Sequence, residues 1–262
     1  MMRSLYTAAA GMAAQQFNLD VIANNLANVN TNGFKHSRAE FQDTLYQVLR
    51  SQGAQNGQDA TRPVALQVGL GSRTVATTTM LEQGPLQQTS NKYDLAIEGD
   101  GFFKVLLPDG SEAFTRDGQF KVDATGRIVT SDGYPLQPDI LVPSDAISFT
   151  VGSDGTVNVQ VAGDTTIQNL GQVLLARFPN PAGLQRIGHN LFRVSAASGD
   201  AIEGAPGTEG LGSIAQYAIE NSNVQIVEEM VRMILAQRAY EVNSKAITTA
   251  DEMLGLTNNL KR

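Results

Sequence analysis

The sequence predicts an α+β fold in which paired coiled-coil helices from the two ends of the chain flank an inserted, mainly antiparallel β-domain. Two observations support this prediction. Apolar heptad patterns occupy both ends, and turn-forming residues fill the middle. All nine prolines lie between Pro63 and Pro206, and 22 of the 25 glycines lie between Gly53 and Gly212. Since proline and glycine interrupt helices, the ends are expected to be helical and the middle to consist of strands and turns.

The N-terminal thirty residues carry apolar side chains at steps of three and four. The pattern predicts a helix that packs along another helix, although an ordinary amphipathic helix on a globular core remains an alternative for this heptad alone. Asn32-Gly33 is expected to end the helix, because glycine readily adopts the left-handed conformation of a helix C-terminus. The residues of this heptad pattern, all apolar except Gln15, are Leu5, Ala8, Met12, Gln15, Leu19, Ile22, Leu26 and Val29.

The C-terminal helix is predicted to begin at Ser222, which forms a capping-box pattern with Gln225, and to run to about Leu260. The spacing of Glu228 to Arg232 and of Glu241 to Lys245 allows two ion pairs, each worth only a few tenths of a kcal/mol, so packing must stabilise this helix. Its apolar stripe comprises Val224, Val227, Val231 and Ile234, and continues one residue out of phase at Leu235, Ala239, Val242, Ala246, Thr249, Met253, Leu256 and Leu260.

The middle of the chain alternates short apolar segments with Asp-Gly and Pro-Asp-Gly turns, which predicts a compact antiparallel β-domain. Phe103, Val105 and Leu107 are expected to share one face of their strand, as are Phe120 and Val122. Ser195 to Gly212 is expected to be a loop. The predicted strands are 64–68, 74–79, 94–98, 102–107, 113–116, 119–122, 127–130, 147–151, 156–161, 173–178, 191–194 and 214–219.

Three regions follow from these patterns. Residues 1–33 and 221–262 form a helical domain, 34–75 an extended connecting region, and 76–220 a β-rich outer domain. In the connecting region, Phe34 to Arg50 is compatible with a short helix or the start of a strand. Residues 51–61 are small and polar, which is typical of a long loop or a hairpin tip.

Composition excludes several classes of function. The net charge of −7 disfavours a nucleic-acid binder, and no run approaches the roughly twenty apolar residues of a membrane span. There is no cysteine, and the two histidines, His36 and His189, have no second ligand nearby, so no metal or other cofactor is expected. No spacing of residues predicts a catalytic site. The N-terminus lacks a strong apolar core, so no cleaved signal peptide is expected.

Three segments, 19–34, 93–103 and 237–245, resemble the rod and hook proteins of the bacterial flagellum in sequence, order and spacing. Length and the middle region favour the distal-rod members. The resemblance implies a structural subunit that self-assembles into a rigid hollow shaft, with the terminal helices as its inner layer. It also implies export through the flagellar type III apparatus. The implied partners are further copies of the chain, proximal-rod proteins, the hook protein, and the P- and L-ring proteins.

Three sets of residues are predicted to act in assembly. The first set forms the helix seams between subunits: Leu5, Met12, Leu19, Ile22, Leu26, Val29, Val227, Val231, Ile234, Leu235, Val242, Met253 and Leu256. The second set provides amide contacts beside the seam without the desolvation cost of a charge: Asn24, Asn25 and Asn28. The third set lies in a stretch that is expected to stiffen the rod by crossing neighbouring subunits: Tyr46, Val48, Leu49, Gln52, Gln55, Asn56, Gln58 and Pro63.

One alternative function stays open at this point. A secreted β-rich binding module or adhesin could use its terminal helices only to dimerise, and an enzyme is a third class without a predicted site. Long heptads at both ends favour the polymerising subunit, because a binding module does not need such a pair. Formation of rods by the purified chain, seen by electron microscopy, would separate these classes.

Overall fold

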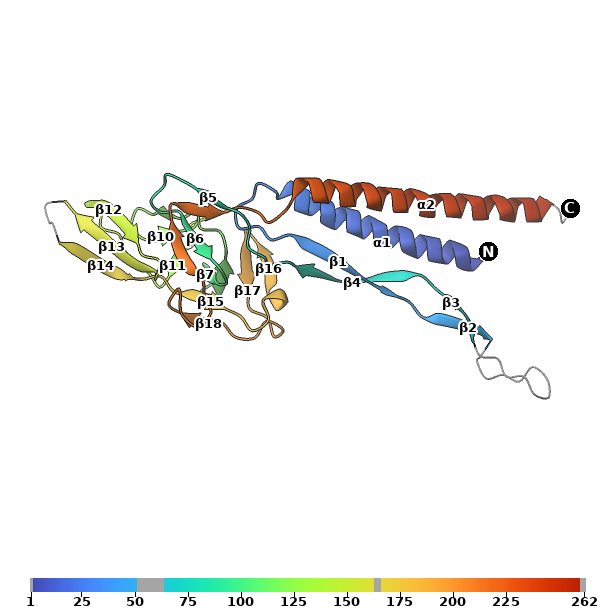
Figure 1. Cartoon of the computed structure of the whole chain (residues 1–262), viewed down its shortest axis with the longest axis horizontal. Coiled ribbons are helices and arrows are strands. Elements are labelled where there is room, and N and C mark those ends of the chain that lie inside the picture. Colours follow the sequence, from blue (N-terminus) through green and yellow to red (C-terminus); the bar gives the residue numbers. More distant parts are fainter. Residues whose placement is uncertain (1, 51–63, 163–165, 260–262) are drawn as a thin grey trace. The chain divides into compact units, whose positions relative to one another are not determined.

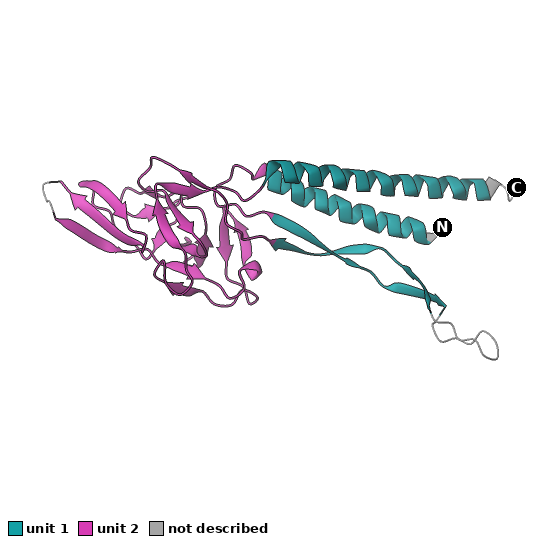
Figure 2. Cartoon of the chain, viewed as in Figure 1, with its two compact units in different colours: residues 1–26, 37–78, 225–262 teal, residues 27–36, 79–224 magenta. Residues whose placement is uncertain are grey.

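A computed structural model describes residues 2–50, 64–162 and 166–259, and it has two helices at the ends of a β-rich chain (Figure 1). The α+β prediction is therefore confirmed. The chain divides into two compact units (Figure 2). Unit 1 comprises 1–26, 37–78 and 225–262, and unit 2 comprises 27–36 and 79–224. The predicted three-part organisation stays a prediction.

Unit 1 combines the terminal helices with a long two-stranded ribbon. Helix α1 spans Met2–Ala27 and helix α2 spans Ile226–Asn259. The ribbon forms where β1 (Ser37–Asp43) pairs with β4 (Ser72–Thr79), and then β2 (Tyr46–Arg50) with β3 (Leu66–Gly69). The open alternative for 34–50 is thus resolved as strand rather than helix.

Helix α1 ends about six residues before the predicted Asn32-Gly33 terminus. Asn28 to Asn30 form a turn, in which the Thr31 N–H donates to the Asn28 carbonyl at 3.1 Å. Asparagine side chains compete with helical hydrogen bonds, which favours a turn here. Gly33 does adopt a positive φ of 67°, but it does so beyond the helix.

Helix α2 begins four residues after the predicted cap at Ser222. The Ser222 hydroxyl accepts a hydrogen bond from the Val224 N–H at 3.2 Å. This bond spans two residues, whereas a capping box would need a bond to the N–H three residues on. Asn223 holds this segment extended, since its side chain accepts the His36 N–H at 2.8 Å and donates to the Met80 carbonyl at 2.9 Å. These bonds outweigh the local capping signal.

Unit 2 contains a seven-stranded sheet and several smaller antiparallel sheets. The strands of the large sheet are, in order, β16 (Gln185–Gly188), β17 (Leu191–Arg193), β8 (Glu112–Thr115), β7 (Phe102–Leu106), β15 (Leu175–Arg177) and β18 (Ile202–Gly204), with β11 (Leu136–Gln137) also pairing with β7. A three-stranded sheet follows the order β12 (Ala146–Val151), β13 (Thr156–Val161) and β14 (Ile167–Gln172).

The remaining strands form pairs, and Pro181–Gly183 is a short 3-10 helix. The pairs are β19 (Ser213–Gln216) with β6 (Leu95–Glu98), β20 (Ala218–Glu220) with β5 (Leu86–Gln88), and β9 (Lys121–Val122) with β10 (Ile128–Val129). The segment 195–212, which was predicted to be a loop, contains the strand β18. Strands β5, β11, β14 and β16 were not predicted either.

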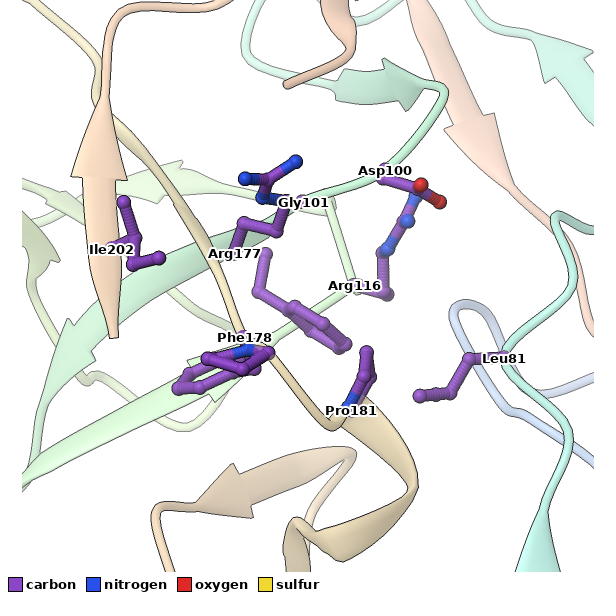
Figure 3. Close-up of a pocket in the computed structure, with 10 residues that line it drawn as sticks. Leu81, Asp100, Gly101, Arg116, Arg177, Phe178, Pro181 and Ile202 are labelled. Atoms are coloured by element: carbon purple, nitrogen blue, oxygen red, sulfur yellow. The ribbon is translucent and has the colours of Figure 1, made fainter. Parts of the chain in front are cut away.

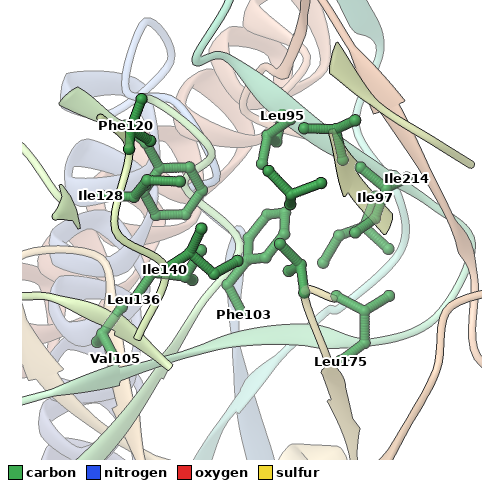
Figure 4. Close-up of a cluster of buried hydrophobic side chains, with 14 of the residues drawn as sticks. Leu95, Ile97, Phe103, Val105, Phe120, Ile128, Leu136, Ile140, Leu175 and Ile214 are labelled. Atoms are coloured by element: carbon green, nitrogen blue, oxygen red, sulfur yellow. The ribbon is translucent and has the colours of Figure 1, made fainter. Parts of the chain in front are cut away.

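The core of unit 2 lies on both faces of the large sheet. Phe103 and Val105 point from β7 into the larger apolar cluster, where Phe103 meets Phe120 edge-to-face at 5.2 Å between ring centroids (Figure 4). Leu107 and Val122 pack against the same cluster, so the predicted alternation is confirmed. Phe102 points the other way, into a smaller cluster. Unit 2 thus has a hydrophobic core of its own, made of two clusters on opposite faces of the large sheet.

Candidate assembly surface

The two helices of unit 1 meet at a buried polar clamp formed by Asn25, Ser37 and Glu229. The Asn25 amide donates to the Ser37 carbonyl at 2.8 Å and accepts the Ser37 N–H at 2.9 Å. It also donates to the Glu229 carboxylate of α2 at 3.4 Å, and Arg232 donates to the same carboxylate at 3.0 Å. Asn25 and Glu229 are 1% and 3% exposed. Because a misplaced helix would leave these buried groups unpaired, the clamp specifies the register of the pair.

The fully buried positions of α2, among its described residues, are small or polar. Glu229, Ala236, Asn243 and Ala250 follow one another at intervals of seven residues; Ala236 and Ala250 are buried. Asn243 lies so close to Gly11 of α1 that a Cβ atom there would come within 2.9 Å of the Asn243 amide nitrogen. The inward heptad therefore differs from the apolar stripe that the sequence predicts.

Most of the predicted apolar stripe of α2 instead lies on the exposed side of the helix, whereas Val224 is buried in unit 2, before the helix begins. All seven of its predicted interface residues are exposed, from 46% to 74%: Val227, Val231, Ile234, Leu235, Val242, Met253 and Leu256. A helix normally buries its large apolar side chains and exposes its small polar ones. In a single chain α2 does the reverse, so its strongest packing surface is unused.

The predicted seam of α1 is only partly covered. Ile22 is buried, and Leu5, Met12, Leu19 and Leu26 are half-buried. Val29 lies beyond the end of α1, in the turn that belongs to unit 2, so it is not part of the helix, and its place in a contact between subunits stays a prediction.

The three predicted amide contacts have different surroundings. Asn25 is the buried clamp residue, and Asn24 is exposed on the helix. Asn28 accepts a hydrogen bond from the Thr31 hydroxyl at 3.2 Å in the turn after α1. Asn25 is thus a contact residue between the two helices, and the predicted roles of Asn24 and Asn28 in assembly stay predictions.

Exposed apolar surface is concentrated in unit 1. Of the 27 large apolar side chains that are exposed among the described residues, 21 belong to this unit. Of the six apolar residues that it buries, five are alanines and only Ile22 is large. So many exposed large apolar side chains in one unit are typical of a protein–protein interface.

The ribbon contributes to this surface. Every residue of β2 is exposed, including Tyr46, Val48 and Leu49 at 56%, 52% and 44%. The Tyr46 ring lies over Gly69 on β3, where a Cβ would be 3.3 Å from the ring. An isolated two-stranded ribbon is marginally stable in water, so further contacts would stabilise it. The other predicted residues of this stretch, Gln52, Gln55, Asn56, Gln58 and Pro63, lie outside the described residues.

A groove of about 400 Å³ runs between α1, α2 and β1. Val21 and Ile22 line it from α1, Ala39 from β1, and Leu235 and Ala239 from α2. Its apolar walls continue the outward stripe of α2, so it can accept an apolar side chain.

Unit 2 contains a buried ion cluster that has no signature in the sequence. The Glu220 carboxylate accepts hydrogen bonds from the Lys35 ammonium, from Arg116 at 3.3 Å and from the Gly84 N–H at 2.8 Å. Burial lowers the pKa of both Lys35 and Arg116, and Glu220 opposes this shift. The Gly33 N–H donates to the Glu220 carbonyl at 2.8 Å. The cluster therefore joins the segment after α1 to the segment before α2.

The outer charges of α2 agree in part with the prediction. Arg232 donates to Glu228 at 3.4 Å, as predicted, whereas Glu241 pairs with Arg238 at 2.9 Å. Glu241 thus pairs with a residue three positions before it instead of with Lys245, four positions after it. Residues three apart are also neighbours on a helix surface.

The two histidines lie apart from any group of ligands. His189 is exposed, with Nδ1 at 3.3 Å from Asp132, and His36 is half-buried. Within 2–50, 64–162 and 166–259, no group of three or more His, Cys, Asp or Glu residues could hold a metal ion. Nor does that part of the chain include a helix long and apolar enough to cross a membrane.

Three family models match the chain in succession. Residues 5–35 match a "flagella basal body rod protein" model, 96–159 a "flagellar hook protein FlgE/F/G D1 domain", and 215–260 a "flagellar basal body rod FlgEFG protein C-terminal" model. Relatives that match over the full length of the chain are also flagellar rod proteins. The chain is 54% identical to the flagellar basal-body rod protein FlgG of Borreliella burgdorferi over 100% of both chains.

The chain belongs to the flagellar basal-body rod protein family. It is also 48% identical to FlgG of Caulobacter vibrioides, over 99% of this chain and 100% of that one, and 43% identical to FlgG of Bacillus subtilis over 100% of both. It is thus a structural subunit of the basal-body rod, located in the flagellar basal body, where it assembles with other flagellar components. The resemblance is confirmed, and the alternative of a secreted adhesin has no support.

Proposed function

We propose that this chain is the subunit of the distal rod, a self-assembling, rigid and hollow shaft that transmits torque from the motor to the hook. One observation carries the proposal: among its described residues α2 fully buries only Glu229, Ala236 and Ala250, and it exposes the seven large apolar side chains of the predicted interface. In the rod, other subunits would cover this exposed apolar face. The role is structural rather than catalytic.

Helices α1 and α2 would form the inner layer of the tube. Seven exposed apolar side chains on α2 would be buried between subunits. Full burial of each is worth about 1.5–3 kcal/mol, and about half of each is still available, so the stripe supplies roughly 5–10 kcal/mol. This is comparable with the estimated cost of association, roughly 4–15 kcal/mol, and the groove and ribbon add to it.

The proposed neighbours are copies of the chain within the rod, proximal-rod proteins below, the hook protein above, and the P- and L-ring proteins around the shaft. The chain would reach this place through the flagellar type III export apparatus, without a cleaved signal peptide. No nucleic acid, cofactor or direct insertion into the membrane is part of this proposal.

Substitution in the outward stripe tests the inner-layer assignment. Ile234→Asp is expected to abolish polymerisation, because a carboxylate would be buried without a partner between helices. Leu26→Asp should act in the same way through α1. Ile167→Asp is the matched control, since Ile167 is also exposed, at 73%, but lies on β14 of unit 2. Electron microscopy scores rods, and circular dichroism verifies the β-domain; normal rods from Ile234→Asp would overturn the assignment.

A second experiment addresses the stretch from Tyr46 to Pro63, which we propose stiffens the rod by crossing neighbouring subunits. Deletion of residues 52–61 should allow polymerisation but give curved, more flexible rods. The ordering of such a stretch costs roughly 1–2 kcal/mol per residue, so it needs contacts to offset that cost. Deletion rods as straight as those of the unmodified chain would assign the stretch to a solvated linker.

A further inference from the structure

A cavity of about 450 Å³ opens on unit 2 at one edge of the large sheet (Figure 3). Its apolar wall includes Phe102 and Phe178, whose rings meet edge-to-face at 5.7 Å between centroids. Leu81, Pro181 and the half-exposed Ile202 of the edge strand β18 complete this wall. The cavity is large enough for one or two side chains of another chain.

Two arginines line the polar side of the same cavity. Arg116 donates to Glu220 at 3.3 Å and to the Gly99 carbonyl at 2.8 Å, but its Nε is buried and has no hydrogen-bond partner. The Arg116 side chain is only 3% exposed. Arg177 is half-buried and, within the described part of the chain, its guanidinium group makes no hydrogen bond or ion pair. Asp100 is the one carboxylate among the lining residues.

This donor set defines the chemistry of a ligand. Buried polar groups in folded proteins are almost always hydrogen-bonded, so an orphaned guanidinium nitrogen indicates a missing acceptor. Guanidinium groups bind carboxylates in preference to neutral acceptors, with short charge-assisted hydrogen bonds. The aromatic and aliphatic wall accepts an apolar side chain beside that carboxylate.

We propose that this cavity anchors Asp145 and Ile147 of a second copy of the chain during assembly. Asp145 is exposed and, among the described residues, its carboxylate has no partner. Ile147 is 68% exposed at the start of β12. The two side chains are two residues apart, so one insertion can place the carboxylate at the arginines and the isoleucine against the apolar wall.

The position of the two elements suits a growing polymer. The cavity is lined by Arg177 of β15 and Ile202 of β18. Ile147 lies on β12 and Asp145 directly precedes it, in the three-stranded sheet that is labelled separately from β15 and β18 in Figure 1. A contact between two different patches of identical subunits is heterologous, and it leaves one free patch at each end for the next subunit. The inference rests on the proposed self-assembly and adds an outer contact that does not involve the helices.

Charge exchange tests the pairing in the full-length chain. Arg177→Glu should raise the concentration needed for polymerisation about tenfold or more, because an anion then faces Asp145. Asp145→Arg should weaken assembly similarly, and the double variant should recover most of the loss. Ile147→Ser should also weaken assembly, because it removes the side chain that would pack against the apolar wall. Asp139→Arg, at an exposed aspartate in the preceding loop, is the matched control for Asp145→Arg, and Ile167→Ser is the matched control for Ile147→Ser.

Crosslinking gives an independent readout, because the chain has no native cysteine. Chains with Arg177→Cys and Asp145→Cys together should form a ladder of disulfide-linked oligomers upon polymerisation, and Arg177→Cys with Asp139→Cys should not. Unchanged assembly by Arg177→Glu, no recovery in the double variant, or no ladder would overturn the proposal. If the unsubstituted chain forms no rods in the same assay, the proposed self-assembly fails instead.

Discussion

Glu220→Gln is predicted to destabilise unit 2 by about 3–5 kcal/mol, the usual cost of removing one partner from a buried ion pair. Glu220 is 1% exposed, and its carboxylate is the shared acceptor for Lys35, Arg116 and the Gly84 N–H. Glutamine keeps the side-chain volume, but it removes the charge and one acceptor oxygen. Two cations would then remain buried without the anion that compensates them.

Thermal unfolding of the chain at a concentration where it is monomeric measures this cost. For a unit of about 150 residues, each kcal/mol corresponds to about 2–4 °C in Tm, so the expected decrease is about 6–20 °C. Calorimetry or near-ultraviolet circular dichroism follows the transition of the β-domain. The apolar surface of unit 1 makes the monomeric state essential, because polymerisation would stabilise the folded chain by mass action.

Glu203→Gln is the matched control. Glu203 accepts a hydrogen bond from Lys104 at 2.7 Å, but its side chain is 34% exposed. An exposed pair is worth at most about 1 kcal/mol, so this control should lower Tm by a few degrees at most. Equal losses for the two variants would refute the reasoning, because they would show that the buried cations do not depend on the Glu220 charge.

Three further predictions concern unit 2. Asp123 should titrate with a pKa of about 2, because the Thr125 hydroxyl donates a hydrogen bond to its carboxylate. Since this pKa is lower in the folded chain than in the unfolded chain, the ionised carboxylate stabilises the fold above about pH 4, and this stabilisation is lost as the pH falls toward 2. A carbon-13 NMR titration of Thr125→Val should show that pKa nearer 3.8, and an unchanged value would contradict the assignment. Phe103→Ala should cost about 3–5 kcal/mol in urea unfolding, since Phe103 is 0% exposed; a loss below 1 kcal/mol would disprove tight packing. Gly33→Ala should cost more than about 1 kcal/mol in the same assay, because its φ is 67° and the added Cβ would lie 2.6 Å from the Asp117 nitrogen; wild-type stability would contradict this.

The β-domain was largely predictable because its signals are local. Turn residues delimit β7 and β8, and alternation along β7 identifies Phe103 and Val105 as core residues. Strand β14 was missed because none of its residues is buried and they lack a one-sided apolar pattern. Strand β18 is a three-residue edge strand inside a segment rich in small residues. Short and exposed strands depend on pairing across the sheet, which periodicity does not report.

The helix pair shows a different limit of sequence reasoning. Heptads identify α1 and α2, but they do not identify which face is covered within the same chain and which face by another. The inward face of α2 depends on the bond between Asn25 and Glu229, residues 204 positions apart. Lys35 and Glu220 are likewise 185 positions apart. No spacing rule predicts such a pair, since each charge looks like an ordinary surface residue until the strands are in place.

The ribbon has a topological property that bears on how the family can vary. Its two ends meet, because the Met80 N–H donates to the His36 carbonyl at 2.9 Å, and residues 37 to 79 leave and return at that single point. Such an excursion can be lengthened or shortened from its tip without moving either flanking residue. Each doubling of a flexible loop costs only about 0.6 kcal/mol in closure entropy. The ribbon is therefore the place where insertions and deletions can accumulate while the helices and the β-domain stay unchanged.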